Sequence, residues 1–331
     1  MKAAWYSRNG PAREVLEVGD LPRPVPRAGE VLVELHASGV NPSDVKSRVG
    51  RPVEGGVIVP HSDGAGVIAE VGPGVPKERI GERVWIWNGQ WQRPMGTAAE
   101  FIALPQRQAV PLPAPVSFEA GACIGIPLLT ALQAVRLAGD LAGDLAGRTL
   151  LVIGGGSAVG HYVTQLARRR GATVLATAGS DARRDHAGAA GAHHVIDYKR
   201  EDVATRVKAL TAGIGADAVI DMDFSTTAKL LPQGALRPHG RLVGYGSNQP
   251  GDVPVHFRTL LWSSLELRFF VVYDLLPADR EAVTREAVEL LAGNALAHTI
   301  GAVFPLEDVA AAHEKVESGE LVGNVVLKIR G

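Results

Sequence analysis

Cysteine, net charge and long apolar runs are all scarce in this chain of 331 residues. Its one cysteine, Cys123, excludes intrachain disulfides and any metal site built from several thiolates. Lys and Arg number 34 and Asp and Glu number 35, so no basic excess favours nucleic acid. No stretch approaches the roughly 18 uninterrupted apolar residues of a membrane-spanning helix. We therefore expect a cytoplasmic protein without nucleic-acid or membrane partners.

The length of the chain and the order of its strand-like and helix-like segments predict two domains of the α/β class. Residues 31–37 and 64–71 are small and β-branched between Gly and Pro, which is typical of short strands. From Thr149 onward, apolar stretches alternate with segments long enough for helices, which predicts a doubly wound parallel sheet. Its strands are expected at 149–153, 174–177, 195–197, 218–221 and 241–244. A tandem repeat at 137–144 is expected to lengthen a helix-to-loop connection.

A glycine-rich loop at 154–160 lies between a predicted strand and a predicted helix, with the sequence GGGSAVG. Glycines allow a sharp turn and a close approach to phosphate, and the N–H groups at a helix start favour an anion. The loop lacks a strict G-x-G-x-x-G pattern. It therefore predicts a dinucleotide site, while a tight turn without a ligand stays an alternative.

The end of the second predicted strand distinguishes NADPH from NADH. Enzymes that prefer NAD usually place an acid there to bind the ribose hydroxyls, but this chain has Ala178-Gly179-Ser180. Ser180 and Arg183 offer a hydroxyl and a fork of donors for a 2′-phosphate, so the sequence favours NADPH. Arg183 as a solvated helix residue is the alternative, and Asp181 is expected to cap the helix and point away.

With the loop placed, the whole chain resembles the zinc-independent, zeta-crystallin-like quinone oxidoreductase branch of the medium-chain dehydrogenase/reductase superfamily. Four segments carry the resemblance by their order and spacing: GVNPSD at 39–44, SDGAGVI at 62–68, GERV at 81–84 and GIPLLTA at 125–131. The resemblance implies a GroES-like β domain at 1–123 and 296–331, and a Rossmann NADPH-binding domain at 124–295. It also implies a homodimer formed by edge pairing of Rossmann sheets, for which residues 267–272 are the candidate edge.

The zinc ligands of alcohol dehydrogenase relatives have no counterpart here. Where those relatives carry Cys and His ligands, this chain has Asn41 and Ser62, which are not competitive zinc ligands. His61 lies one residue from the second position, but position 41 offers no thiolate. We expect an active site without metal.

The resemblance also implies a set of cofactor contacts, spread over both expected domains. They are Asn41, Thr130, Gly154, Gly156, Ser157, Ala158, Val159, Gly179, Ser180, Arg183, Tyr198, Tyr245, Gly246, Ser247, Val271, Val272 and Asn324. Val271 and Val272 are expected on a strand. Two departures from the family pattern stand out: Ser157-Ala158 replaces a glycine pair, and Lys46 replaces an aromatic residue.

The expected chemistry is hydride transfer from NADPH to a small, flat, apolar quinone. Asn41 could polarise the acceptor oxygen, and Asp44 or Lys46 could help to deliver a proton through water; structural roles for both remain open. Trp91, on a loop, could form an apolar wall of the substrate pocket. Two alternatives stay open: a reductase of 2-alkenal or enone double bonds, and a crystallin-like structural or RNA-binding protein that holds NADPH without turnover.

Overall fold

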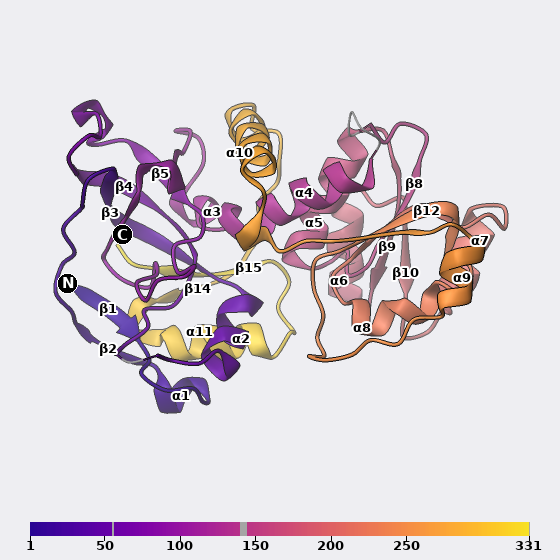
Figure 1. Ribbon diagram of the computed structural model, residues 1–331, viewed down its shortest axis with the longest axis horizontal. Helices are drawn as coiled ribbons and strands as arrows, with labels where there is room; N and C mark the ends of the chain where they lie inside the picture. Colours follow the sequence, from indigo (N-terminus) through magenta and orange to yellow (C-terminus); the bar gives the residue numbers. More distant parts are fainter. Residues whose placement is uncertain (55, 140–143, 331) are drawn as a thin grey trace. The chain divides into compact units, whose positions relative to one another are not determined.

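The computed structural model describes residues 1–54, 56–139 and 144–330 (Figure 1). Two compact units make up the chain: a first unit from Met1 to Ile126 and from Arg285 onward, and a second unit from Pro127 to Thr284. The later division falls inside one continuous helix, α10 (Pro277–Ala292). The domain limits expected after residues 123 and 295 stay a prediction. Half of the 137–144 repeat, residues 140–143, lies outside the described residues.

The first unit is built on a seven-stranded sheet of order β14-β15-β3-β4-β5-β7, with β6 also paired to β3. β6 pairs with the first half of β3 and β15 with its second half, so the C-terminal segment lies in this unit. A separate antiparallel pair joins β1 and β2. The strands are β1 (Lys2–Trp5), β2 (Glu17–Asp20), β3 (Glu30–Val40), β4 (Asp63–Val71), β5 (Arg83–Ile86), β6 (Phe101–Pro105), β7 (Ala109–Pro111), β14 (Ile300–Pro305) and β15 (Asn324–Lys328).

Apolar side chains at every second position explain why the β3 segment forms a strand. Val31, Val33 and Leu35 point into one apolar core cluster, as the period of two predicts. A β-carbon at Gly66 would lie 2.0 Å from the Glu34 carbonyl oxygen, so glycine is needed for β4 to pack this closely. The α-helices of this unit are α1 (Ala12–Val15), α2 (Pro42–Gly50), α3 (Phe118–Gly121) and α11 (Val309–Glu317).

The second unit contains a six-stranded, all-parallel sheet of order β10-β9-β8-β11-β12-β13. Its strands are β8 (Thr149–Val152), β9 (Thr173–Ala178), β10 (His194–Asp197), β11 (Ala216–Asp221), β12 (Leu236–Gly244) and β13 (Glu266–Phe269). The strand order reverses between β8 and β11. Ligands of doubly wound sheets bind at such a switch point, beyond the carboxyl ends of the strands. The predicted α/β class with a parallel sheet is confirmed.

Helices lie between these strands along the chain, and one further helix, α4, precedes the first strand. They are α4 (Leu129–Ala138), α5 (Ala158–Arg169), α6 (Asp181–Ala189), α7 (Val203–Leu210), α8 (Phe224–Thr227) and α9 (Phe257–Trp262). Helices α4 and α5 pack against each other and against the sheet (Figure 1). Within the described residues, no helix combines the length and the apolar character needed to cross a membrane.

The expectation that Val271 and Val272 lie on a strand was wrong. β13 ends at Phe269, and its last pairing bond runs from the Phe270 N–H to the Gly244 carbonyl, where β12 also ends. Beyond that point the neighbouring strand offers no partner. The chain turns instead, and the Asp274 N–H donates to the Val271 carbonyl oxygen.

Candidate active site

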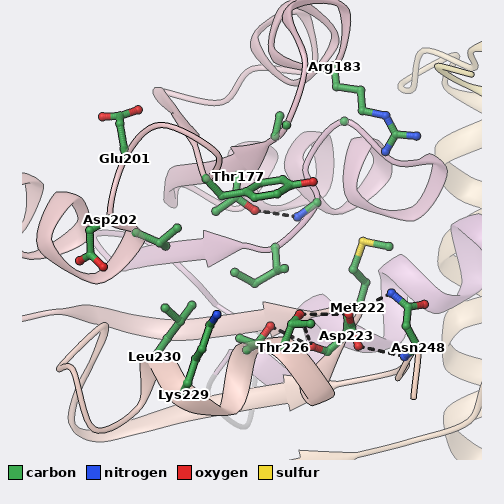
Figure 2. A pocket seen from close by; sticks show the side chains of 18 of the residues that line it. Thr177, Arg183, Glu201, Asp202, Met222, Asp223, Thr226, Lys229, Leu230 and Asn248 are labelled. Carbon is green, nitrogen blue, oxygen red and sulfur yellow. Dashed lines mark hydrogen bonds between the residues drawn. The ribbon is translucent and has the colours of Figure 1, made fainter. Parts of the chain in front are cut away.

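A pocket of about 570 Å³ opens at the carboxyl ends of β8, β9 and β11, where the strand order reverses. Gly154 and Gly156 line it from the glycine loop, and Gly179 from the end of β9. Figure 2 shows Arg183 and Asn248 toward one end of the pocket, and Glu201 and Asp202 toward the other. The glycine loop and the end of β9, found separately in the sequence, therefore meet at one cavity.

Close contacts in the loop explain why it contains glycines. Gly154 has a φ of +71°, and a β-carbon on it would lie 2.2 Å from the Met222 sulfur. A β-carbon on Gly156 would lie 2.6 Å from the Arg183 carbonyl oxygen, and one on Gly160 would lie 2.2 Å from the Gly154 carbonyl oxygen. Without side chains, the loop packs directly against the first turns of α5 and α6.

Ser157 begins α5 as its N-cap. Its hydroxyl oxygen accepts the Gly160 N–H at 3.0 Å, and its own N–H donates to the Gly154 carbonyl at 2.9 Å. The N–H groups of Gly156, Ala158 and Val159 have no hydrogen-bond partner among the described residues. Unpaired N–H groups at the start of a helix bind anions, so this arrangement fits a pyrophosphate. The Ser157-Ala158 departure keeps these donors.

The end of β9 carries no carboxylate, and an aromatic ring covers it. A β-carbon on Gly179 would lie 2.5 Å from the Tyr198 hydroxyl oxygen, so the tyrosine can lie there only because residue 179 is glycine. Ser180 is the N-cap of α6 and accepts the Arg183 N–H at 3.4 Å. The expectation that Asp181 caps this helix was wrong: Asp181 is the first helical residue, and its exposed carboxylate pairs with Arg184.

A role for two acidic residues at the end of β11 was not identified from the sequence, although Asp221 ends a predicted strand and Asp223 follows it by two residues. Asp223 accepts hydrogen bonds from the Asn248 N–H and side-chain amide, both at 2.9 Å, and from the Thr226 hydroxyl at 3.0 Å. Burial acts to raise the pKa of Asp223, but these donors and Ser225 outweigh it and hold the pKa below its usual value. Burial raises the pKa of Asp221 to about 6. Asp223 thus fixes the Asn248 loop at the pocket wall.

In the first unit, Asn41, Asp44 and Asp63 form a buried polar group. The register of β3 and β4 pairs Gly39 with Asp63, which brings the residues next to these strand ends together. Asn41 Nδ2 donates to Asp63 Oδ2 at 3.0 Å, and the Asn41 N–H donates to Asp44 Oδ2 at 2.7 Å. Burial raises the pKa of Asp44 to about 7 and, helped by the neighbouring Asp44 charge, raises that of Asp63 well above its usual value.

The remaining predicted residues occupy different environments. Lys46 is exposed on α2, on the opposite side of that helix from the buried Asp44. The Trp91 ring is half-buried, with the Arg51 guanidinium 5.5 Å from its centre. Asn324, the first residue of β15, is buried and donates through Nδ2 to the Thr299 carbonyl at 3.0 Å. Thr130 is buried in α4, and Tyr245, Gly246 and Ser247 directly follow β12.

The donor set near Asn41 does not fit a catalytic zinc ion. Within the described ranges, no group of three His, Cys, Asp or Glu side chains could hold a metal. Both ring nitrogens of His61 already have hydrogen-bond partners, Ser38 and His313. Zinc would need thiolate, imidazole or carboxylate ligands in place of the Asn41 amide and the Ser62 hydroxyl.

Comparison with known proteins identifies the family. The chain matches the alcohol dehydrogenase GroES-like domain over residues 27–114 and the zinc-binding dehydrogenase domain over residues 158–293. A quinone oxidoreductase of Rattus norvegicus is 31% identical over 325 residues, which cover 95% of this chain and 94% of the relative. A 2-haloacrylate reductase of a Burkholderia species is 27% identical over 345 residues, with coverages of 99% and 98%.

Solved structures agree over the full length. An NAD-dependent alcohol dehydrogenase is 31% identical, with a TM-score of 0.88 and complete coverage of both chains. A mycobacterial protein solved in complex with NADPH is 29% identical, with a TM-score of 0.86 and coverages of 99% and 100%. The chain belongs to the quinone oxidoreductase branch of the medium-chain dehydrogenase/reductase superfamily and is an oxidoreductase that binds a nicotinamide dinucleotide.

Proposed function

We propose that this protein is an NADPH-dependent, zinc-independent reductase that transfers hydride to a small quinone-like acceptor. The end of β9 carries the cofactor assignment, because it offers a hydroxyl, a tyrosine and an arginine where an NAD-preferring enzyme has a carboxylate. Without that carboxylate, no negative charge at the end of β9 repels a 2′-phosphate, which gains charge-assisted donors there. The relative named as a quinone oxidoreductase supports the acceptor class.

The proposed cofactor contacts divide by chemistry. Ser180, Arg183 and Tyr198 would bind the 2′-phosphate beside Gly179, and the loop N–H groups of Gly156, Ala158 and Val159 would bind the pyrophosphate, with Gly154 and Ser157 shaping the loop. The ribose and nicotinamide contacts stay predictions from the resemblance: Tyr245, Gly246, Ser247, Val271, Val272, Thr130, Asn324 and Asn41.

In the proposed reaction, the bound nicotinamide supplies the hydride, and the chain supplies orientation and protons. Asn41 Nδ2 donates one hydrogen to Asp63, and its second hydrogen would donate to the acceptor oxygen. Asp44, with a pKa near 7, would exchange a proton with the product through water. A quinone demands little more, because its reduced oxygens are weakly basic. Lys46 is the less favoured proton source, since it is exposed on the other side of α2.

A second candidate function is reduction of an activated carbon–carbon double bond. The 2-haloacrylate reductase relative covers nearly the whole chain and acts on such a bond according to its name. This reaction would use the same cofactor and the same donor at Asn41. It differs in the acceptor carbon, which lies next to a carbonyl or carboxylate rather than in a quinone ring.

Turnover with a panel of acceptors tests these proposals. Purified protein and NADPH are mixed with benzoquinones, naphthoquinones, enones and 2-haloacrylates, and NADPH absorbance is followed. Rapid loss with quinones supports the first candidate, and loss with enones or haloacrylates alone supports the second. Binding of NADPH without loss for any acceptor would refute both, and would favour a cofactor-binding structural protein. Stoichiometric zinc in the purified protein would refute the metal-free site.

A further inference from the structure

A buried histidine pair in the first unit has an unusual backbone and no part in the chemistry above. His61 is fully buried with a φ of +77°, in the left-handed region that residues with a β-carbon rarely adopt. Its Nε2 lies 2.9 Å from Nε2 of His313, which is fully buried on α11. Such a conformation persists only where surrounding contacts hold it, and it is often found at functional sites.

One arrangement of hydrogens satisfies the contacts on the Ser38 side of His61. The Asp63 carbonyl oxygen can only accept, so the Thr97 hydroxyl, 2.5 Å away, donates to it. Ser38 Oγ lies 2.8 Å from Thr97 Oγ1 and must therefore donate to it. Because the Ser38 hydrogen is used, His61 Nδ1 carries a hydrogen and donates to Ser38 at 2.9 Å.

The direction of the remaining contact follows. A neutral His61 with its hydrogen on Nδ1 presents a bare Nε2, so His313 donates to it from its own Nε2. The hydrogen bonds thus run one way, from His313 through His61, Ser38 and Thr97 to the Asp63 backbone. If His61 took up a further proton, its Nε2 and that of His313 would both carry hydrogens, and the hydrogen bond between the two rings would be lost.

The charges around the pair favour its neutral form. Burial and the nearby Arg48 guanidinium of α2 lower the pKa of His313 to about 3, and burial also lowers the pKa of His61. Arg48 pairs with Glu317, which is also on α11, so that carboxylate is already engaged. The pKa of Asp63 is raised well above its usual value and that of Asp44 to about 7, so both carboxyls carry less negative charge at pH 7 than ordinary aspartates. The pair is therefore neutral at pH 7.

Asp63, where the hydrogen bonds end, holds Asn41. Its Oδ2 accepts Asn41 Nδ2 at 3.0 Å and the Ile126 N–H at 3.1 Å, while its carbonyl accepts from Thr97. We infer that His61 and His313 are positioning residues, which act through Ser38 and Thr97 to fix Asp63 and with it the orientation of the Asn41 amide. The inference rests on the role of Asn41 in the proposed function.

Variants of His313 test this role by kinetics. His313→Leu removes the donor, and His313→Gln restores an N–H of similar reach. We expect kcat with the best acceptor to fall on the order of tenfold in the Leu variant and to recover to within about threefold in the Gln variant. The Kd for NADPH should stay unchanged in both. His194→Leu, the same change at an exposed position, is the control. Unchanged kcat in the Leu variant, or equal loss in the Gln variant, would overturn the inference.

Nuclear magnetic resonance tests the hydrogen arrangement without any turnover. In the wild-type protein labelled with ¹⁵N-histidine, His61 should carry its hydrogen on Nδ1 and His313 on Nε2; the opposite tautomers would overturn the inference. The Asn41 side-chain amide signals should shift in the Leu variant, and unshifted signals would count against positioning. If that variant does not fold, His61→Asn replaces it: Asn tolerates a positive φ, but its shorter side chain loses the contact with His313, so the same shift of the Asn41 signals is expected. A wild type without turnover refutes only the proposed function.

Discussion

Arg183 and Arg184 are neighbours on α6 with different surroundings. Arg184 pairs with Asp181 and with Asp197 at 2.6 Å, whereas Arg183 lines the pocket. We predict that Arg183→Ala weakens NADPH binding between about 10- and 100-fold, because a charged donor to the 2′-phosphate is lost. NADH binding should change little. Fluorescence titrations with both cofactors measure this, with Arg169→Ala, an exposed arginine of α5, as the control. Equal losses for both cofactors would contradict the assignment.

Asp44 provides a residue-scale prediction for stability. Its folded pKa of about 7 exceeds that of an unfolded aspartate, so its protonated form stabilises the fold fully below about pH 4, and this stabilisation is lost as the pH rises through about 7. Asp44→Asn cannot ionise and keeps an oxygen for the Asn41 N–H. Relative to wild type, the variant should gain up to ~1.4 kcal/mol in unfolding free energy per pH unit between about pH 4 and 7.

Urea unfolding followed by tryptophan fluorescence measures this gain at several pH values. Trp5, Trp85, Trp87 and Trp91 all lie in the first unit, so the signal reports mainly on the unit that contains Asp44. Asp20→Asn, at an exposed position of β2, serves as the control. Parallel pH dependences of the Asp44 variant and the wild type would show that Asp44 is ionised in the fold.

At the scale of elements, apolar periodicity predicted five of the six strands of the parallel sheet, all except β13, to within a few residues. β12 begins at Leu236 rather than at the predicted residue 241. The polar stretch from Arg237 to His239 interrupts the apolar pattern on which the strand prediction was based. The glycine loop and Gly179 were predictable, since each carries a local steric signal. Asn248 was not, because only the strand order brings it to Asp223. The contact between His61 and His313 spans 252 residues and has no local signal.

Two substitutions at Ser157, the N-cap of α5, distinguish its role in capping the helix from its role in binding the cofactor. Ser157→Ala should cost about 1 kcal/mol of stability through loss of the cap to the Gly160 N–H. Ser157→Asp should retain the cap, because aspartate caps as well as serine, yet weaken NADPH binding at least about tenfold through repulsion of the pyrophosphate. Thermal unfolding and NADPH titration of both variants measure the two effects. Unchanged NADPH binding in the Asp variant would place the pyrophosphate elsewhere.

At the scale of the whole molecule, the second unit presents an open sheet edge and apolar side chains near it. β13 is the last strand of the parallel sheet, and Phe269 on it is 56% exposed. Phe257, Leu261 and Trp262 of α9 are more exposed still, with Trp262 at 75%. An unpaired edge with exposed large apolar side chains favours association, and a two-fold axis lets one patch meet its own copy. We therefore propose a homodimer through β13 and α9.

Trp262→Glu should shift this dimer toward monomer, because two carboxylates would meet in an apolar interface and each would lose its hydration. Size-exclusion chromatography with light scattering at several concentrations measures the mass of the wild type and the variant. Ile80→Glu, at a half-exposed apolar residue of the first unit, is the matched control and should leave the mass unchanged. The proposed interface requires a dimeric wild type and a lighter Trp262 variant. A monomeric wild type, or an equal mass for both, would exclude it, since no other described patch of this unit combines a free strand edge with side chains this exposed.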